Sequence, residues 1–259
     1  MPVPVGPRTR VVTYNVFGDP SGASERASAL MAELEEADAD ILAFQEASSW
    51  FLDRLHRQPW VSAYAGTAIG GERLSPSGLY LLSKYPIEGC GVIDLPGDEG
   101  RAVLYADIRV HDISVRAAVI HLAADLDGRK IRAEQLQVVF DLLRDADHGL
   151  LLGDFNFGDR EPEDWSLEAP YRDLWAELRP GEAGYTFDLA NNTMAQNNAF
   201  ACERSRRLDR ILLRSEEWRE ASITLMGDRA LAGSPALFAS DHFGVIADLV
   251  LPGGWVAQQ

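Results

Sequence analysis

The sequence has few cysteines, no long apolar run and little positive charge, and each shortage excludes a class of protein. Its 259 residues include two cysteines, Cys90 and Cys202, which are too few for a disulfide framework and are not spaced as a zinc site. We therefore expect two free thiols in a reducing compartment. No apolar run approaches the length of a membrane span, and residues 1–10 lack the apolar core of a signal peptide. These absences predict a cytoplasmic protein that does not engage a membrane.

Positive charge is scarce, because 24 Lys and Arg stand against 40 Asp and Glu, for a formal net charge of −16. Such a chain repels polyanions at long range, whereas a protein that grips a long duplex through its phosphates should be basic. A nucleic-acid substrate is therefore expected to be bound at an end or as a short single strand, with a metal cation that offsets the acidic site.

Apolar residues make up 46% of the chain, which is enough for a full-sized core. No repeat, low-complexity tract or linker divides it, so we predict a single domain over residues 1–259 with its core at about 8–252. Two segments carry apolar residues at helical spacing. One is 25–37, for which Ser24 is the expected N-cap, and the other is 129–144.

Apolar and β-branched runs predict strands, and polar residues close many of them. The predicted strands are 10–16, 40–46, 79–83, 102–110, 113–121, 149–154, 207–214, 222–226 and 243–251. His111 and Asp112 are expected to form a hairpin turn. The polar residues at strand ends are Asn15, Glu46, His121, Asp154 with Asn156, Asp209, and Asp241 with His242. Because sites in α/β proteins gather at strand ends, we expect these residues to converge on one crevice.

Two of these strand ends favour phosphate chemistry. Glu46 closes an apolar strand, where it is either a surface glutamate or a hard oxygen ligand for Mg²⁺. In Gly153-Asp154-Phe155-Asn156, the two-residue period of extended chain would turn Asp154 and Asn156 to the same side. The carboxylate could then hold or deprotonate water while the amide donates to a phosphate oxygen. The alternative is an Asx-type turn.

A histidine opens the last predicted strand. His242 could stabilise charge on a phosphoryl oxygen as imidazolium, and such a histidine needs an orienting carboxylate, for which Asp209 is the candidate. The alternatives are a helix cap for Asp241 and a salt bridge of Asp209 with Arg207 or Arg210. Each signal is modest when it is taken alone.

The order of the motifs, from TYNV at Asn15 to SDHFG at His242, resembles the endonuclease/exonuclease/phosphatase superfamily over about residues 9–250. The resemblance implies an α/β (α+β) fold, a four-layer sandwich of two stacked, mostly antiparallel sheets flanked by helices. Within the superfamily the chain is most similar to the 5′-tyrosyl-DNA phosphodiesterase branch. The stretches that carry this similarity are HL…R..QL at 121–136, GDFNFGD at 153–159, YTFD at 185–188 and RLDRI at 207–211. One departure is Phe17, which stands where the N-x-D motif of that branch has Asp.

The resemblance also implies roles for individual residues. Asp154 is expected to orient and deprotonate the attacking water, Asn156 and His242 to stabilise the transition state, Asp209 to orient His242, and His121 to contact the phosphate. Mg²⁺, for which Mn²⁺ could substitute, would be held by Glu46, Asn15 and Asp241. Arg101 and Arg132 are candidates for contact with the phosphate or the adjoining nucleotide. Together with the run Arg204, Arg206 and Arg207, they are expected to form a local cationic lip beside the site.

Three functions remain open at this point. The first is a phosphodiesterase that processes the ends of DNA or RNA, and the second is a phosphatase or phosphodiesterase for a small molecule such as an inositol phosphate or a lipid headgroup. The third is a non-catalytic binding module, which is disfavoured because no catalytic residue is missing apart from the Asp replaced by Phe17. A monomer is expected, and no protein partner can be inferred.

Overall fold

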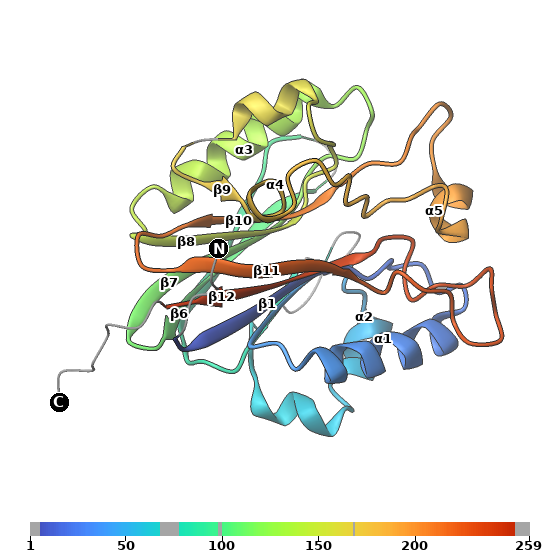
Figure 1. Cartoon of the computed structure of the whole chain (residues 1–259), viewed down its shortest axis with the longest axis horizontal. Helices are drawn as coiled ribbons and strands as arrows, with labels where there is room; N and C mark the ends of the chain where they lie inside the picture. Colours follow the sequence, from blue (N-terminus) through green and yellow to red (C-terminus); the bar gives the residue numbers. More distant parts are fainter. Residues whose placement is uncertain (1–5, 68–77, 98–99, 168, 252–259) are drawn as a thin grey trace.

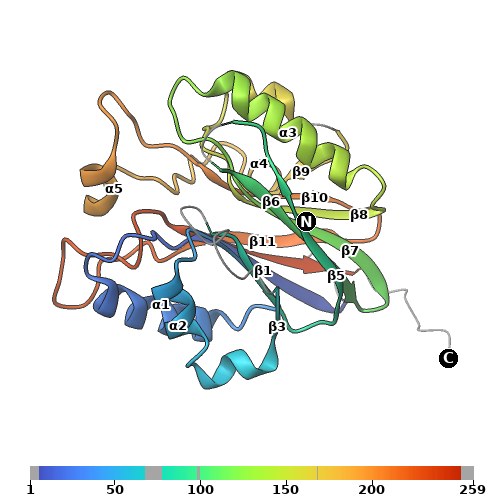
Figure 2. The same cartoon turned by 180° about the vertical axis from the view of Figure 1, so that it is seen from behind.

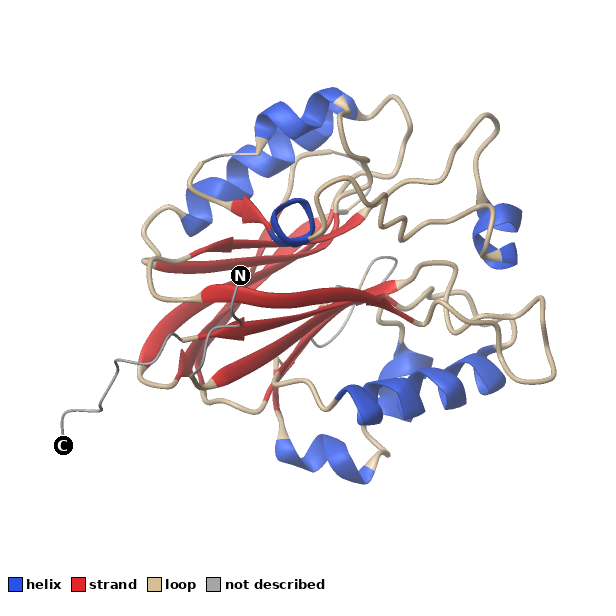
Figure 3. Cartoon of the chain, in the orientation of Figure 1, coloured by secondary structure: helices blue, strands red, loops and turns tan. Residues whose placement is uncertain are grey.

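Two stacked β-sheets between two layers of helices make up the protein, as the computed structural model shows (Figure 1). The structure describes residues 6–67, 78–97, 100–167 and 169–251, so the predicted core boundary at 252 lies outside the described residues. In Figure 3 the strands form the interior and the helices lie outside them, which confirms the predicted four-layer sandwich. Both cysteines are exposed free thiols. None of the helices within the described ranges is long and apolar enough to span a bilayer.

The first sheet has the strand order β11-β12-β1-β2-β4-β3. Its strands are β1 (Arg8–Asn15), β2 (Ile41–Gln45), β3 (Ala65–Gly66), β4 (Tyr80–Ser83), β11 (Arg219–Met226) and β12 (Gly244–Val250). Only β1 and β2 pair in parallel, and the other pairs are antiparallel. Helices α1 (Ala23–Ala37) and α2 (Ser49–Leu55) lie below this sheet in Figure 1, and the view from behind agrees (Figure 2).

The second sheet has the order β5-β6-β7-β8-β10-β9. Its strands are β5 (Ile87–Asp94), β6 (Ala102–Val110), β7 (Ile113–His121), β8 (His148–Asp154), β9 (Arg172–Asp173) and β10 (Asp209–Arg214). Only β7 and β8 are parallel. Helix α3 (Arg129–Leu143) covers its outer face and α4 (Leu174–Leu178) lies nearby, while α5 (Thr193–Asn198) stands apart at the loop-rich end (Figure 1). Short 3₁₀ helices span Pro59–Ala63 and Pro162–Ser166.

Strand alternation explains the three apolar layers of the core. Val11 packs between the sheets, whereas its neighbour Val12 packs against α1 and α2. Leu150 likewise faces the space between the sheets, whereas Leu151 faces α3. Because successive side chains of a strand point to opposite faces, and both faces are covered here, these strands are apolar at nearly every position. This explains why the sequence shows continuous apolar runs that end in polar residues.

The bounds of the predicted strands agree with those in the structure within a few residues, and the predicted hairpin turn is confirmed. His111 and Asp112 have φ angles of 46° and 70°, as a type I′ hairpin turn requires. The predicted cap at Ser24 is wrong, because α1 begins at Ala23, two residues before the predicted start at Glu25, and Gly22, with φ 60°, is its N-cap. Strand Ile87–Asp94 was not predicted, because two glycines interrupt its pattern and much of it is only partly buried.

A partly buried carboxylate on α1 makes the fold sensitive to pH. A Cβ atom placed on Gly227 would lie 2.0 Å from the Tyr14 hydroxyl and 3.2 Å from Glu33 Oε2, so both groups meet at this glycine. Burial, followed by the charges of Asp228 and Glu36, raises the pKa of Glu33 to about 7. Ionising Glu33 therefore costs more in the folded chain than in the unfolded chain.

We expect Glu33→Gln to stabilise the protein at pH 8 and much less at pH 4.5. The folded pKa of about 7 exceeds the ordinary value of 4.5, so the stability of the native protein falls as pH rises between these values and is level above them. After allowance for solvent screening, the gain at pH 8 should be roughly 1–2 kcal/mol, measured by urea unfolding. Glu35→Gln, at an exposed position of the same helix, is the control. An equal gain at both pH values would contradict this prediction.

Candidate active site

Strand register brings the polar strand ends together at the loop-rich end of both sheets, on the right in Figure 1. Asp154, the last residue of β8, pairs across the sheet with His121 of β7 and with Asp209 of β10. Because β10 runs antiparallel to β8, its first residue stands beside the last residue of β8. Asn15 ends β1 in the other sheet, and its Nδ2 donates to Asp154 Oδ2 at 3.1 Å. His242 lies just before β12, so both sheets contribute to one cluster, as the strand ends predict.

Asp154 lies in a tight turn that leaves one of its oxygens facing the cluster. Gly153 is required there, because at its φ of 144° a Cβ atom would lie 2.1 Å from the carbonyl oxygen of Ile120. Asp154 Oδ1 accepts from the backbone N–H of Asn156 at 2.9 Å, and Asn156 has φ 55°. The Asx-type turn therefore forms, and the extended spacing predicted for this stretch is wrong. Asn156 Nδ2 donates to the carbonyl of Leu122 at 2.9 Å.

The second oxygen of Asp154 faces two histidines. Oδ2 lies 3.4 Å from Nε2 of His121 and 3.9 Å from Nε2 of His242. Burial alone would raise the pKa of Asp154, but His242 and His121 hold it below its ordinary value, so this carboxyl is ionised at neutral pH. Burial, followed by the charge of Arg101, lowers the pKa of His121 to about 3, so its ring is neutral. A neutral His121 can act on a substrate as a hydrogen-bonding group but not as a cation.

His242 and Asp209 form a buried pair. Nδ1 of His242 lies 2.8 Å from Oδ2 of Asp209. Burial raises the pKa of Asp209 to about 6, which is still below neutral. Burial opposes the charge on His242, but Asp209 and Asp154 together raise its pKa well above the ordinary value, so the proton resides on the imidazole. The alternative salt bridge of Asp209 with Arg207 or Arg210 is not formed, since both arginines pair with other carboxylates.

Thr186 anchors this pair from the YTFD stretch. Its hydroxyl accepts from the backbone N–H groups of Leu208 and Asp209 at 2.9 and 3.0 Å, and its carbonyl accepts from that of Phe243 at 2.7 Å. The next residue, Phe187, places its ring 5.1 Å from that of His242, measured between ring centroids. This stretch therefore connects the start of β10 to the start of β12.

Glu46 follows β2 with a φ of 57°, and hydrogen bonds hold both of its oxygens. Oε1 accepts from Asn15 Nδ2 at 3.1 Å, and Oε2 accepts from the N–H of Gly18 at 2.8 Å. Burial and then the charge of Asp241 raise the pKa of Glu46. Asp241 is the N-cap of none of the described α-helices, and its Oδ2 accepts from the side-chain amide of Asn198 at 3.0 Å. Two like charges near one another in a buried setting favour a bound cation.

A buried arginine, which the sequence did not single out, secures the loop beside Glu46. Arg26 is 0% exposed, and its Nη2 donates to the carbonyls of Phe17 and Asp19 at 3.1 and 2.6 Å. Its guanidinium lies 4.8 Å from the centroid of the Phe17 ring, and the N–H of Phe17 donates to Asn15 Oδ1 at 3.1 Å. The available signal was a charge on the apolar face of α1, four residues before Leu30.

Two of the predicted substrate arginines belong to the framework of the fold. Arg132 is buried, with Nε donating to Glu163 at 3.0 Å. Arg207 is buried and forms ion pairs with Asp159 and Asp173. Their donors are engaged by these carboxylates, and the contact of both arginines with substrate stays a prediction.

Residues 12–242 match the sequence profile of the Endonuclease/Exonuclease/phosphatase family. The chain belongs to this family. Its reaction class is accordingly the hydrolysis of phosphate esters, and the predicted superfamily is confirmed. A search of curated protein sequences gives no significant match.

Solved structures agree with the family at the level of the fold. TDP2 of D. rerio, complexed with single-strand DNA product, superposes with a TM-score of 0.81 at 23% identity over 93% of this chain and 98% of that one. TDP2 of C. elegans gives a TM-score of 0.79 at 20% identity, over 94% of this chain and 75% of that one. The human Nocturnin catalytic domain gives 0.71 at 18% identity over 96% of both chains. These likenesses, all below 25% identity, show that the fold is shared.

Enzymes of the Endonuclease/Exonuclease/phosphatase family use a divalent metal, and two groups of side chains could hold one. One group is Asp154, Asp209 and His242, whose ligand atoms lie within 4.8 Å of one another. In that group, however, Asp209 Oδ2 is bound to His242 Nδ1 at 2.8 Å, and the raised pKa of His242 keeps its imidazole protonated, so this ring offers no lone pair to a metal. The other group is Glu46 with Asp241 and the amide oxygen of Asn15. It offers only oxygen ligands and two carboxylates whose like charges raise the pKa of Glu46, so it fits a hard divalent cation better.

Proposed function

We propose that this protein is a Mg²⁺-dependent phosphodiesterase that processes nucleic-acid ends. The observation that carries the proposal is the surroundings of Asp154. This ionised carboxylate is buried, its Oδ1 is held by a turn, and its Oδ2 faces Asn15, His121 and His242. Such an arrangement can hold a water molecule beside groups that stabilise a phosphorane-like charge.

In the proposed mechanism, Glu46, Asn15 and Asp241 would hold Mg²⁺. When bound, this cation polarises a phosphate oxygen and neutralises developing charge. Asp154 orients the attacking water and accepts its proton, while His242, kept protonated by Asp209, donates through Nε2 to an equatorial oxygen.

Two other groups complete the proposed phosphate site. One amide hydrogen of Asn156 is bound to Leu122, and the other is assigned to a second phosphate oxygen. His121, neutral and with Nδ1 unpaired among the described residues, provides a further hydrogen bond. Arg101, whose charge acts on His121, remains a candidate for the phosphate or the adjoining nucleotide.

The choice of a nucleic-acid end rests on two observations. The D. rerio TDP2 structure that shares this fold is complexed with single-strand DNA product. The net charge of −16 opposes binding along a duplex and favours a short strand. The same charge is compatible with a small phosphorylated molecule, such as an inositol phosphate or a lipid headgroup, which is the second candidate.

A substrate panel tests the proposal. Hydrolysis would be measured with Mg²⁺ on 5′-tyrosyl DNA, abasic DNA, RNA with 3′ or 2′,3′-cyclic phosphate ends, poly(A) and inositol phosphates. We expect the highest kcat/KM on a polynucleotide end, and the preferred end would name the leaving group. A preference for inositol phosphates over every polynucleotide would overturn the nucleic-acid proposal and favour the second candidate.

Removal of the metal should abolish this activity. We expect no turnover in EDTA and full recovery with Mg²⁺, and Mn²⁺ should substitute, because the proposed ligands are all oxygens. Glu46→Gln should weaken Mg²⁺ binding by at least tenfold in a calorimetric titration, since it removes one charged ligand. Glu35→Gln, on the surface of α1, should bind Mg²⁺ as the wild type does. Full activity after exhaustive chelation would rule out the metal mechanism.

A further inference from the structure

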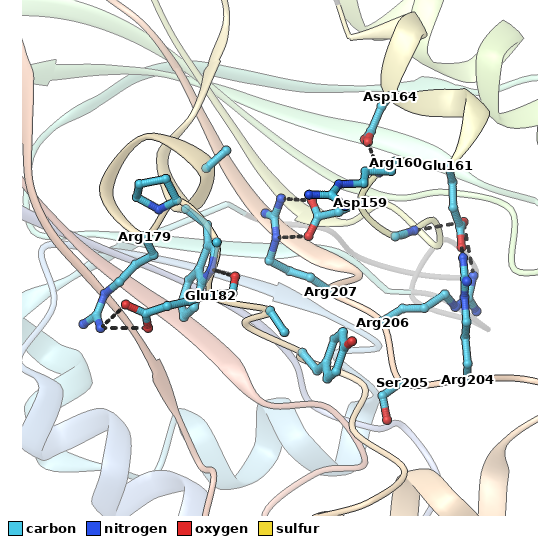
Figure 4. A pocket seen from close by; sticks show the side chains of 17 residues that line it. Asp159, Arg160, Glu161, Asp164, Arg179, Glu182, Arg204, Ser205, Arg206 and Arg207 are labelled. Atoms are coloured by element: carbon cyan, nitrogen blue, oxygen red, sulfur yellow. Dashed lines mark hydrogen bonds and ion pairs between the residues drawn. The ribbon is translucent and has the colours of Figure 1, made fainter.

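The structure has a cavity of about 610 Å³, whose lining side chains are drawn in Figure 4. It is lined by the turn at 158–161, by the segment 179–185 and by residues 204–207. Arg206 joins the cavity to the centre, because its Nη1 donates to the carbonyl of Asn156 at 3.4 Å. Its backbone also pairs with Phe187, whose ring lies against His242. Arg206 therefore connects the lining of the cavity to two segments that carry residues of the centre.

The charge of the cavity lining differs from that of the whole chain. Five arginines line it against four carboxylates, whereas the chain has 24 basic and 40 acidic residues. Arg207 pairs with Asp159, and Arg179 pairs with Glu182. Across the described part of the chain, the guanidinium of Arg160 makes no hydrogen bond or ion pair, so one positive charge in the lining is uncompensated.

The arginines are held in place from behind. Glu161 accepts from the N–H of Gly158 at 3.0 Å and from Arg204 at 3.1 Å, and it lies 3.7 Å from Arg206. Arg206 is only 7% exposed, and its Nε is buried without an acceptor among the described residues. A buried donor of this kind is costly unless a ligand or a water molecule accepts from it. In Figure 4, Arg204 to Arg207 come from one segment and Asp159 to Glu161 from the turn that faces it.

An exposed aromatic ring completes the lining. Tyr185 is 41% exposed, although it lies only two residues from the buried Phe187. Proteins that bind single-stranded nucleic acid combine cationic grooves with aromatic rings on which bases stack. The cavity has both elements.

We propose that this cavity is a second subsite, which binds the nucleotide adjoining the one attacked. Arg160 and Arg204 bind its phosphate, and Tyr185 stacks on its base. The proposal rests on the proposed function, and it adds that the enzyme recognises at least two successive nucleotides of a single strand. Because the net charge of the chain is −16, we expect the protein to repel the rest of the strand and to bind only a few nucleotides.

Binding without turnover tests the subsite. In an Asp154→Asn background, affinities would be measured by calorimetry for thymidine 5′-monophosphate and for 5′-phosphorylated trithymidylate. We expect the trinucleotide to bind about 5- to 100-fold more tightly, the range that stacking of one base provides. Arg160→Ala with Arg204→Ala should remove most of this gain and leave the mononucleotide unaffected. The slope of log Kd against log salt should also decrease by about 0.7, as expected for one lost phosphate contact.

Matched controls distinguish the subsite from general effects of charge. Arg57→Ala removes an exposed arginine near α2, on the other side of the molecule, and should change neither affinity nor slope. Tyr185→Ala should reduce the gain without changing the salt slope. Equal losses for mononucleotide and trinucleotide, or a gain that survives removal of both arginines, would overturn the proposal.

Two further measurements complete the test. One distinguishes a nucleotide from an inositol phosphate as the ligand of the cavity, and the other distinguishes failure of the subsite from failure of the proposed function. Inositol 1,4-bisphosphate offers a second phosphate without a base. If its affinity exceeds that of the mononucleotide by as much as the affinity of the trinucleotide does, and Tyr185→Ala does not change this affinity, the assignment of the cavity to a nucleotide is wrong. Wild-type protein that cleaves no phosphodiester but shows the arginine-dependent gain would refute the proposed function and leave the subsite intact. Cleavage without any gain would refute the subsite alone.

Discussion

Asp154→Asn should lower kcat by roughly 10²–10⁴, the range that a general base contributes. The amide oxygen of the new side chain can still accept from the N–H of Asn156, so the turn that ends β8 should persist. The second position, however, becomes an amide that faces Asn15 and His121, and it can no longer accept a proton from water. The measurement is kcat on the best substrate of the panel, with melting temperature and substrate affinity as checks of the fold.

A matched substitution at the other end of the same strand provides the control. Asp147→Asn changes an exposed aspartate just before β8, and it should leave kcat unchanged. If Asp154→Asn also kept kcat within about twofold of the wild type, Asp154 would be a turn residue and the mechanism would need another base.

His242→Ala and Asp209→Ala should each lower kcat by roughly 10²–10⁴, and the double variant should be little worse than the more damaged single one. The reason is the buried contact of 2.8 Å between Nδ1 of His242 and Oδ2 of Asp209, which makes the two side chains one unit. Once the imidazole is lost, the carboxylate has nothing left to orient. The double-mutant cycle in kcat measures this coupling.

Because Asp209 is fully buried, its removal could damage the fold as well as the chemistry. Asp209→Asn keeps the volume and separates the two effects, since the amide can still reach Nδ1 but no longer stabilises an imidazolium. Thermal unfolding of each variant monitors the fold. Losses in log kcat that simply add would show that Asp209 acts independently of His242.

Much of the site could be predicted because it depends on where apolar strands end. The alternation of β8 buries Leu150 and Leu151 on opposite faces of the sheet. A charged residue that follows such an apolar run is therefore expected at the end of the strand. Asp154 and His121 are the last residues of β8 and β7, and the register of these two strands brings them together. Local pattern is sufficient there, because the strands that carry these residues are long, apolar and regular.

The arginines could not be assigned in the same way. The sequence around an arginine at the start of a helix is the same whether its side chain is solvated, bound to substrate or paired within the protein. Arg132 was predicted to touch substrate, yet it is buried against Glu163 from a separate segment. Arg26 was overlooked, yet it secures the loop that orients Asn15. A buried ion pair is defined by a partner distant in sequence, and no local pattern contains that partner.

The backbone conformation of the turn after Asp154 could not be predicted from the local sequence pattern either. Extended spacing was expected to place Asp154 and Asn156 side by side, but Asn156 adopts a positive φ and closes a turn on Asp154. The Asx-type turn forms through one oxygen of Asp154, while the other oxygen faces the cluster. The distinction depends on two oxygens of one side chain, which a sequence cannot separate.

The sequence by itself determined the family, the sandwich of two sheets and the central residues from Asn15 to His242, because strand periodicity and the order of motifs are properties of the linear chain. Only the tertiary structure decided which charges are free to act. It buried Arg132 and Arg207 in ion pairs, and it placed Arg160 and Tyr185 on the lining of one cavity. The physical reason is that the role of a charged side chain depends on its neighbours in space, and these come from segments that the fold alone brings into contact.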